Sequence, residues 1–196
     1  MDLLAFLLFA IATSATPGPN NIMVSAAAAN HGFRATIPHI LGIAAGLSVM
    51  LLIFGSGLAG PLAADPRLHG LLRWVGVAWM LWLAAKIAFA KGALSGGTGR
   101  PPLSFLGAVF FQWINPKAWL IALATVATYT TAAGSLYRQV ALLALLSFLV
   151  SLPCVGAWAV LGAGAGRFLA TPRRLRVFNI VMALLLVASL LPLLRD

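Results

Sequence analysis

The chain has 196 residues, of which 62% are hydrophobic and 8% are charged, and its mean hydropathy is +1.02. A soluble domain of this size cannot bury that much apolar surface, so the composition indicates an all-α, polytopic membrane protein of one domain. The formal net charge of +10 lies mainly in short loops, where it sets topology and meets anionic lipid head groups. Because no basic stripe with interleaved aromatics lies outside the apolar runs, we expect no nucleic-acid partner.

Three membrane spans are predicted in the first half of the chain. The first covers residues 3–29 and is interrupted at Pro17-Gly18-Pro19, so neither piece alone reaches the about 20 residues that a bilayer requires. After a polar loop, the second and third spans cover residues 40–58 and 70–90. In the second span, Gly42 and Gly46 form a G-x-x-x-G pair, which either allows close helix packing or reflects ordinary glycine enrichment.

Three further spans are predicted in the second half, after a Gly-rich polar linker over residues 91–102. The fourth span covers 103–129 and is broken at Asn115-Pro116. The fifth covers 140–162 with a kink expected at Pro153, a basic loop covers 164–176, and the sixth span covers 177–194. The chain thus divides into a first repeat over about 1–90, the linker, and a second repeat over 103–196.

The distribution of Lys and Arg predicts the orientation. The loops after the first, third and fifth spans carry eight basic residues and the opposite side carries four. Because basic loops stay in the cytoplasm, both termini are predicted to lie outside it, in the periplasm.

The two broken spans suggest a common design. Pro17 and Pro116 lie 99 residues apart, about half the chain. Each half has three spans, an odd number, so the halves cross the membrane in opposite senses. Inverted repeats with a discontinuous helix at matching positions are typical of secondary transporters, in which substrate binds near the midplane at the breaks.

The residues at the breaks indicate what such a site would bind. Asn115 is a favoured N-cap and Pro116 is favoured at the first helical position, so a half-helix begins there. Gly18-Pro19 predicts the same with a weaker cap. Free backbone N–H groups and the positive ends of two helix dipoles then converge, and Lys117 adds a full charge. Such a site favours a carboxylate.

Three amide side chains lie near the breaks, and the prolines and Lys117 also allow an interpretation without a binding site. Asn20 and Asn21 add donors and acceptors, and Gln112 either contacts substrate or bonds backbone carbonyls that Pro116 frees. In the alternative, the prolines only kink their helices and Lys117 snorkels to the membrane surface. The long apolar runs on both sides of Lys117 make snorkelling difficult.

These motifs resemble the LysE/RhtB family of amino-acid exporters over the whole chain. The segments that carry the resemblance are Thr16-Pro17-Gly18-Pro19-Asn20, Gly32-x-Arg34, Gly42-x-x-x-Gly46, Asn115-Pro116-Lys117-Ala118 and Gly76-Val77-Ala78-Trp79, where Trp79 stands at a usual aromatic position. The resemblance implies efflux of amino acids or related metabolites across the bacterial inner membrane, driven by an ion gradient, by a homodimer.

The positions of the acidic residues restrict which substrates and which proton carriers fit the sequence. Asp and Glu occur only as Asp2, Asp65 and Asp196, so no carboxylate proton carrier lies within a span. Coupling to a proton must then use Lys117, a histidine such as His39, or the substrate itself, although a histidine here is more often a plain loop residue. Without an intramembrane acid, a neutral amino acid is favoured over one with a cationic side chain.

Other functions find less support in the sequence. Three histidines and no intramembrane acid provide neither a catalytic triad nor a metal-ligand cluster, so we expect no enzyme activity, no cofactor and no bound metal. An exporter of metal ions on the same scaffold would need Cys, Asp or Glu ligands in the spans, where only Cys154 is present. Export of another small solute on this scaffold is a further alternative. A non-transporting membrane assembly protein would explain the glycine pair but not Lys117.

Overall fold

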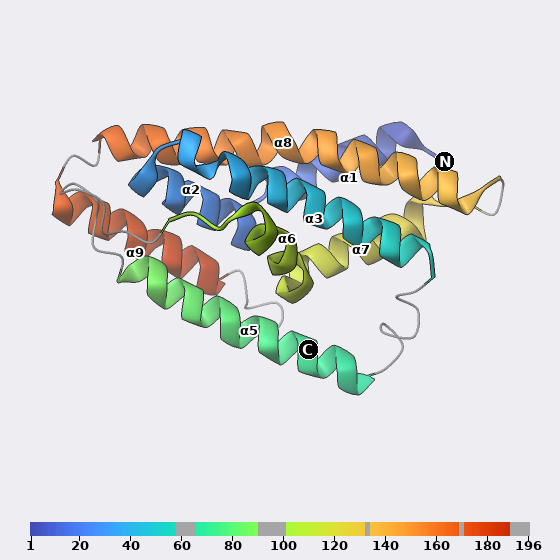
Figure 1. Ribbon diagram of the computed structural model, residues 1–196, viewed down its shortest axis with the longest axis horizontal. Coiled ribbons are helices and arrows are strands. Elements are labelled where there is room, and N and C mark those ends of the chain that lie inside the picture. Colours follow the sequence, from blue (N-terminus) through green and yellow to red (C-terminus); the bar gives the residue numbers. More distant parts are fainter. Residues whose placement is uncertain (58–65, 90–100, 132–133, 169–170, 189–196) are drawn as a thin grey trace.

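A computed structural model describes residues 1–57, 66–89, 101–131, 134–168 and 171–188 (Figure 1). All regular structure in these ranges is helical, which confirms the predicted all-α class. The elements are α1 (Leu3–Ala15), α2 (Pro19–His31), a 3-10 turn η1 (Arg34–Thr36), α3 (Ile37–Gly55), α5 (Pro66–Ala88), α6 (Phe105–Ile114), α7 (Pro116–Tyr129), α8 (Leu136–Phe168) and α9 (Pro172–Ala188).

The helix breaks follow from the prolines. A residue that precedes proline is driven out of the helical region by a clash with the proline ring. Thr16, Gly18 and Asn115 each precede a proline, and all three are extended, with ψ of 141°, 176° and 105°. The axes of α1 and α2 consequently differ in direction by 50°.

Local capping residues define several other helix ends. The Asp2 carboxylate accepts a hydrogen bond from the Ala5 N–H at the start of α1, and the Ser104 hydroxyl accepts one from Gly107 at the start of α6. Gly32 ends α2 with a φ of +82°, a left-handed conformation that favours glycine.

The central pair of the bundle is α3 and α8, which pack antiparallel (Figure 1). Ile40 near the start of α3 clusters with Val155, whereas Leu51 near its end clusters with Ala144. The Ser48 hydroxyl donates to the Ala144 carbonyl at 2.9 Å and joins the two helices midway.

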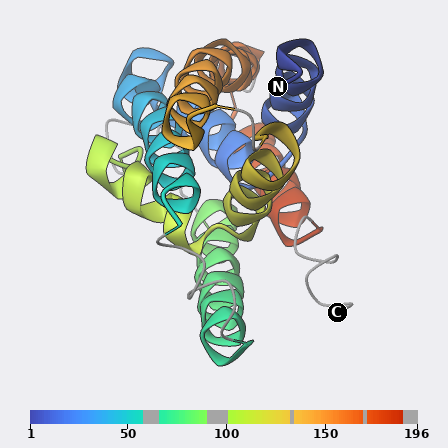
Figure 2. The ribbon, with the colours of Figure 1, turned by 90° about the vertical axis from the view of Figure 1, so that its right-hand side faces the viewer.

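The broken helices cover this pair crosswise. Helices α1 and α2 pack against α8, while α6 and α7 pack against α3, so each half of the chain covers the long central helix of the other half. Helix α5 packs mainly against α9 and lies apart from the central pair, as the end view in Figure 2 shows.

The glycine pair of α3 is a contact surface for α6. A Cβ atom added at Gly42 would lie 2.7 Å from the Ala108 Cβ, and one added at Gly46 would lie 2.7 Å from the Gln112 Cγ. Both distances are far below van der Waals contact, so the close-packing interpretation of these glycines holds, and any side chain there would push α6 outward.

Several predicted boundaries differ from the structure. The second span begins at Ile37, because Pro38 fits the first helical turn. Helix α8 continues through Pro153 without interruption and extends to Phe168, while α9 already begins at Pro172. Most of the predicted basic loop over 164–176 is therefore helical, since arginine is a good helix former. Residues 91–100 of the predicted linker lie outside the described ranges.

Two helices of the described ranges are long and apolar enough to cross a bilayer alone: the continuous run Arg34–Gly55, which comprises η1 and α3, and Leu136–Ala165 within α8. The bent pair of α1 and α2 passes the same criterion as one unit, and α6 is a shorter apolar helix. The apolar helices agree with a membrane protein.

Candidate functional site

The two predicted breaks meet in the folded chain. A Cβ atom added at Gly18, in the first break, would lie 2.9 Å from both the Cδ and the Nζ atoms of Lys117, in the second. The Lys117 ammonium donates to the backbone carbonyls of Thr16 at 3.1 Å and of Pro17 at 3.4 Å. The N-termini of α2 and α7 therefore lie at one place, and Lys117 lies between them.

An amide pair forms a second link between the breaks. The Asn20 side chain donates to the Gln112 Oε1 at 2.9 Å, and the Gln112 Nε2 donates to the Asn20 Oδ1 at 3.2 Å. Gln112 is fully buried and also donates to the Ala108 carbonyl at 2.9 Å, one turn back in α6. Gln112 therefore links its own helix to the opposite break, and a contact between Gln112 and substrate stays a prediction.

Further side chains bind the carbonyls at the end of α1. The last carbonyls of a helix have no partner within it. The Asn21 amide donates to Ser14 at 2.7 Å and to Thr16 at 2.9 Å, and the Trp158 indole of α8 donates to Ala15 at 3.0 Å. Asn21 is only 3% exposed, so it serves here as a buried support of the break.

The start of α7 has the capping arrangement that the sequence predicts. The Asn115 side chain accepts a hydrogen bond from the Lys117 N–H at 3.1 Å, and Pro116 occupies the first turn. The Trp119 indole donates to the Trp113 carbonyl at 2.9 Å and thereby spans the break from the other side. These bonds fix the direction of the α7 N-terminus.

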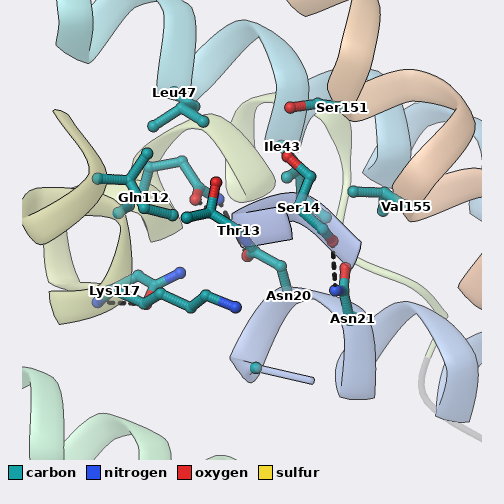
Figure 3. A pocket seen from close by; sticks show the side chains of 14 residues that line it. Thr13, Ser14, Asn20, Asn21, Ile43, Leu47, Gln112, Lys117, Ser151 and Val155 are labelled. Carbon is teal, nitrogen blue, oxygen red and sulfur yellow. Dashed lines mark hydrogen bonds between the residues drawn. The ribbon is translucent and has the colours of Figure 1, made fainter. Parts of the chain in front are cut away.

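A small cavity of about 40 Å³ lies between the breaks (Figure 3). Gln112 and Lys117 line one side of it, and Asn20 and Asn21 line the other. A water molecule requires roughly 10–15 Å³, so the cavity can hold a few water molecules but no amino acid. A larger solute can enter only if Lys117 turns away or the broken helices separate.

The predicted site residues differ in their placement. Of the eight residues predicted to bind substrate, five line the cavity: Gly18, Asn20, Asn21, Asn115 and Lys117. The three prolines of the breaks, Pro17, Pro19 and Pro116, are not among its lining residues. His39 is not the expected loop residue. It lies within α3, is 1% exposed, and is not among the residues that line the cavity. Trp79 belongs to α5, and its side chain lies outside the described part of the structure.

Sequence reasoning missed other members of the site. The polar ones are Thr13 and Ser14 from α1 and Ser151 from α8. The apolar wall consists of Ile43, Leu47, Ala118, Ile121 and Val155. Polar residues within predicted apolar spans were an available signal for the first group. Among the described residues, no group of three His, Cys, Asp or Glu could hold a metal ion.

Comparisons with known proteins place this geometry in a family. The LysE type translocator family matches residues 11–195. The chain is 36% identical over 189 residues to the cysteine/O-acetylserine efflux proteins of Salmonella choleraesuis (strain SC-B67) and Salmonella typhimurium (strain LT2), covering 95% of this chain and 94% of theirs.

A relative in Escherichia coli (strain K12) carries the same name, and it is 32% identical over 93% of this chain and 92% of its own. No solved structure matches the chain significantly. A family match over nearly the whole length, together with these relatives, agrees with the motif resemblance at both breaks. The chain is a member of the LysE type translocator family.

Proposed function

We propose that this protein exports small neutral amino acids across the bacterial inner membrane. The relatives are named for cysteine and O-acetylserine, both small, polar and zwitterionic at neutral pH. In this proposal the substrate carboxylate binds at the N-termini of α2 and α7, together with Lys117. The convergence of those two helix starts is the observation that carries the proposal.

The electrostatics of the breaks support an anionic group as the ligand. Each helix start presents the positive end of a dipole, and Lys117 adds one full charge. The first N–H groups of α7, those of Lys117 and Ala118, are already bonded to Asn115, so at that helix the dipole and the ammonium charge are what attract an anion. No Asp or Glu belongs to a helix of the described ranges, so none in that part of the structure balances the charge. A carboxylate would supply the missing negative charge, whereas a cationic side chain would find no counter-ion.

The helix pairing supports an architecture of six spans in two inverted repeats, about 1–90 and 103–196. If the two halves of the chain exchanged places, α6 and α7 would replace α1 and α2, and α3 would replace α8. The packing of α1 and α2 on α8 would then become the packing of α6 and α7 on α3, and the structure contains both. The same exchange maps the antiparallel pairs α3–α8 and α5–α9 onto themselves. In a transporter, rocking of one half against the other would expose the breaks alternately to each side.

Coupling, orientation and assembly belong to the same proposal. Transport is driven by an ion gradient, with the proton as the coupling ion and Lys117, His39 or the substrate as its carrier. The η1 turn with Arg34 and the basic start of α9 lie at the same end of the bundle in Figure 1, which supports a cytoplasmic location for that end and periplasmic termini. The protein acts as a homodimer, as the family resemblance implies.

Transport assays on a matched pair of variants test the site. Lys117→Ala removes the charge between the breaks, and Lys86→Ala removes a charge from an exposed position on α5. A hydrogen bond to a charged group contributes about 1.5–3 kcal/mol, so Lys117→Ala should lower cysteine or O-acetylserine transport by at least about tenfold. The readout is uptake of labelled substrate into proteoliposomes at equal protein content. Equal transport by wild type and Lys117→Ala would refute the site.

A further inference from the structure

The carbonyl groups after α1 bind an ammonium group in this structure. Thr16 and Pro17 follow the last helical residue of α1, where the negative end of a helix dipole lies. Their carbonyls accept hydrogen bonds from the Lys117 ammonium at 3.1 and 3.4 Å. Two carbonyl oxygens at a helix C-terminus thus form a cation-binding position within the break.

The other donors at this helix end are part of the fixed structure. Asn21 is buried in the first turn of its own helix, and Trp158 reaches Ala15 from α8. Lys117, in contrast, is half-buried and reaches its acceptors through a flexible four-carbon chain. Of the donors described at the end of α1, the Lys117 ammonium is therefore the charged and movable one.

The proposed carboxylate site competes with this position for Lys117. A carboxylate is a stronger acceptor for an ammonium than a neutral carbonyl is. When Lys117 turns to the carboxylate, the carbonyls of Thr16 and Pro17 lose a charged donor, which is unfavourable unless another donor replaces it. An amino acid brings that donor, because its ammonium and carboxylate are joined through one carbon atom.

We propose that the Thr16 and Pro17 carbonyls form the subsite for the substrate's α-ammonium group, and that Lys117 occupies it when no substrate is bound. This inference rests on the proposed function. Binding then exchanges one ammonium for another on the carbonyls while Lys117 pairs with the carboxylate. The subsite requires a free amine, so N-acylated amino acids and the corresponding keto acids are excluded from transport.

Competition against cysteine transport in proteoliposomes tests the subsite with the unaltered protein. N-acetylcysteine keeps the carboxylate and lacks the ammonium, whereas unlabelled cysteine carries both groups. We expect N-acetylcysteine to compete at least about tenfold more weakly than cysteine, from the loss of charged hydrogen bonds. Equal competition would overturn the ammonium subsite and leave the carboxylate site standing. Absence of any amino-acid transport would instead refute the proposed function.

A binding measurement separates the two roles of Lys117. Cysteine amide keeps the ammonium and lacks the carboxylate, so it can use only the proposed subsite. In Lys117→Met the internal competitor is gone, and we expect the amide to bind about tenfold more tightly than to wild type in detergent micelles. Lys117→Gln is the alternative where Lys117→Met does not fold. Unchanged or weaker binding of the amide would contradict the exchange.

Discussion

Asn20 and Gln112 exchange two side-chain hydrogen bonds, at 2.9 and 3.2 Å, although they lie 92 residues apart in the sequence. Asn20 stands in the first turn of α2, and Gln112 stands near the end of α6. The pair therefore ties the first half of the chain to the second at the place where both helices are interrupted. If the halves move against each other during transport, this link must break or be replaced.

Removal of either amide should uncouple the two breaks. We expect Asn20→Ala and Gln112→Ala each to destabilise the protein by about 1–3 kcal/mol, because each leaves a polar partner unsatisfied in a mostly buried position. The double variant should be less destabilised than the sum of the singles, by about 0.5–3 kcal/mol. Thermal denaturation of the purified proteins in detergent measures all three. If the destabilisation of the double variant equals the sum of the two single destabilisations, the Asn20–Gln112 contact has no coupling energy.

The glycine contact between α3 and α6 predicts a position-specific effect of one methyl group. Gly46→Ala places a Cβ against Gln112, and overpacking of this kind is typically destabilising by about 1–3 kcal/mol. Gly156→Ala in α8 is the matched control, because its Cβ would meet no described atom within 4 Å. That control should be neutral or stabilising by up to about 1 kcal/mol, since alanine favours helices.

The comparison uses melting temperatures and transport rates of both variants. Gly46→Ala should also lower transport, because the displaced Gln112 can no longer reach Asn20. Two variants with equal melting temperatures would show that α3 and α6 are not in close contact.

The breaks could be predicted from sequence because their cause is local. Pro17, Pro19 and Pro116 each force the preceding residue to be extended, whatever lies around them, and Asn115 caps the helix that follows. Convergence of the breaks followed only from the assumption of inverted halves. The sequence contains no local signal for that convergence.

Other members of the site depend on packing between distant segments. Trp158 reaches Ala15 across 143 residues, and Ser151 faces the cavity because α8 packs antiparallel to α3. His39 is buried within α3, a helix against which α6, α7 and α8 pack, and that packing between distant segments is not visible in the local sequence. Helix ends were misjudged where arginines near Pro172 suggested a loop, because local composition does not distinguish a basic loop from a basic helical turn.

The proposed orientation can be tested with single cysteines at the two ends of the bundle. In a Cys154→Ser background, Phe33→Cys lies beside Arg34 and Ser135→Cys lies before α8, and both positions are exposed. A membrane-impermeant maleimide should label Ser135→Cys in intact cells and Phe33→Cys only after permeabilisation, because the more basic side stays in the cytoplasm. The reverse pattern would invert the orientation, and labelling of both in intact cells would contradict the span count between them.

The imidazole of His39 is buried within α3. Neither ring nitrogen has a hydrogen-bond partner within the described part of the chain, and the side chain is 1% exposed. An unsatisfied buried polar group is destabilising by about 1–3 kcal/mol, so His39→Leu should stabilise the protein by a similar amount.

If His39 carries the coupling proton, the same variant should lose accumulation driven by a pH gradient while it retains exchange of substrate across the membrane. His31→Leu, at the end of α2, is the control and should change neither property. A stabilised His39→Leu that still accumulates substrate would remove His39 from the proton carriers and leave Lys117 or the substrate in that role.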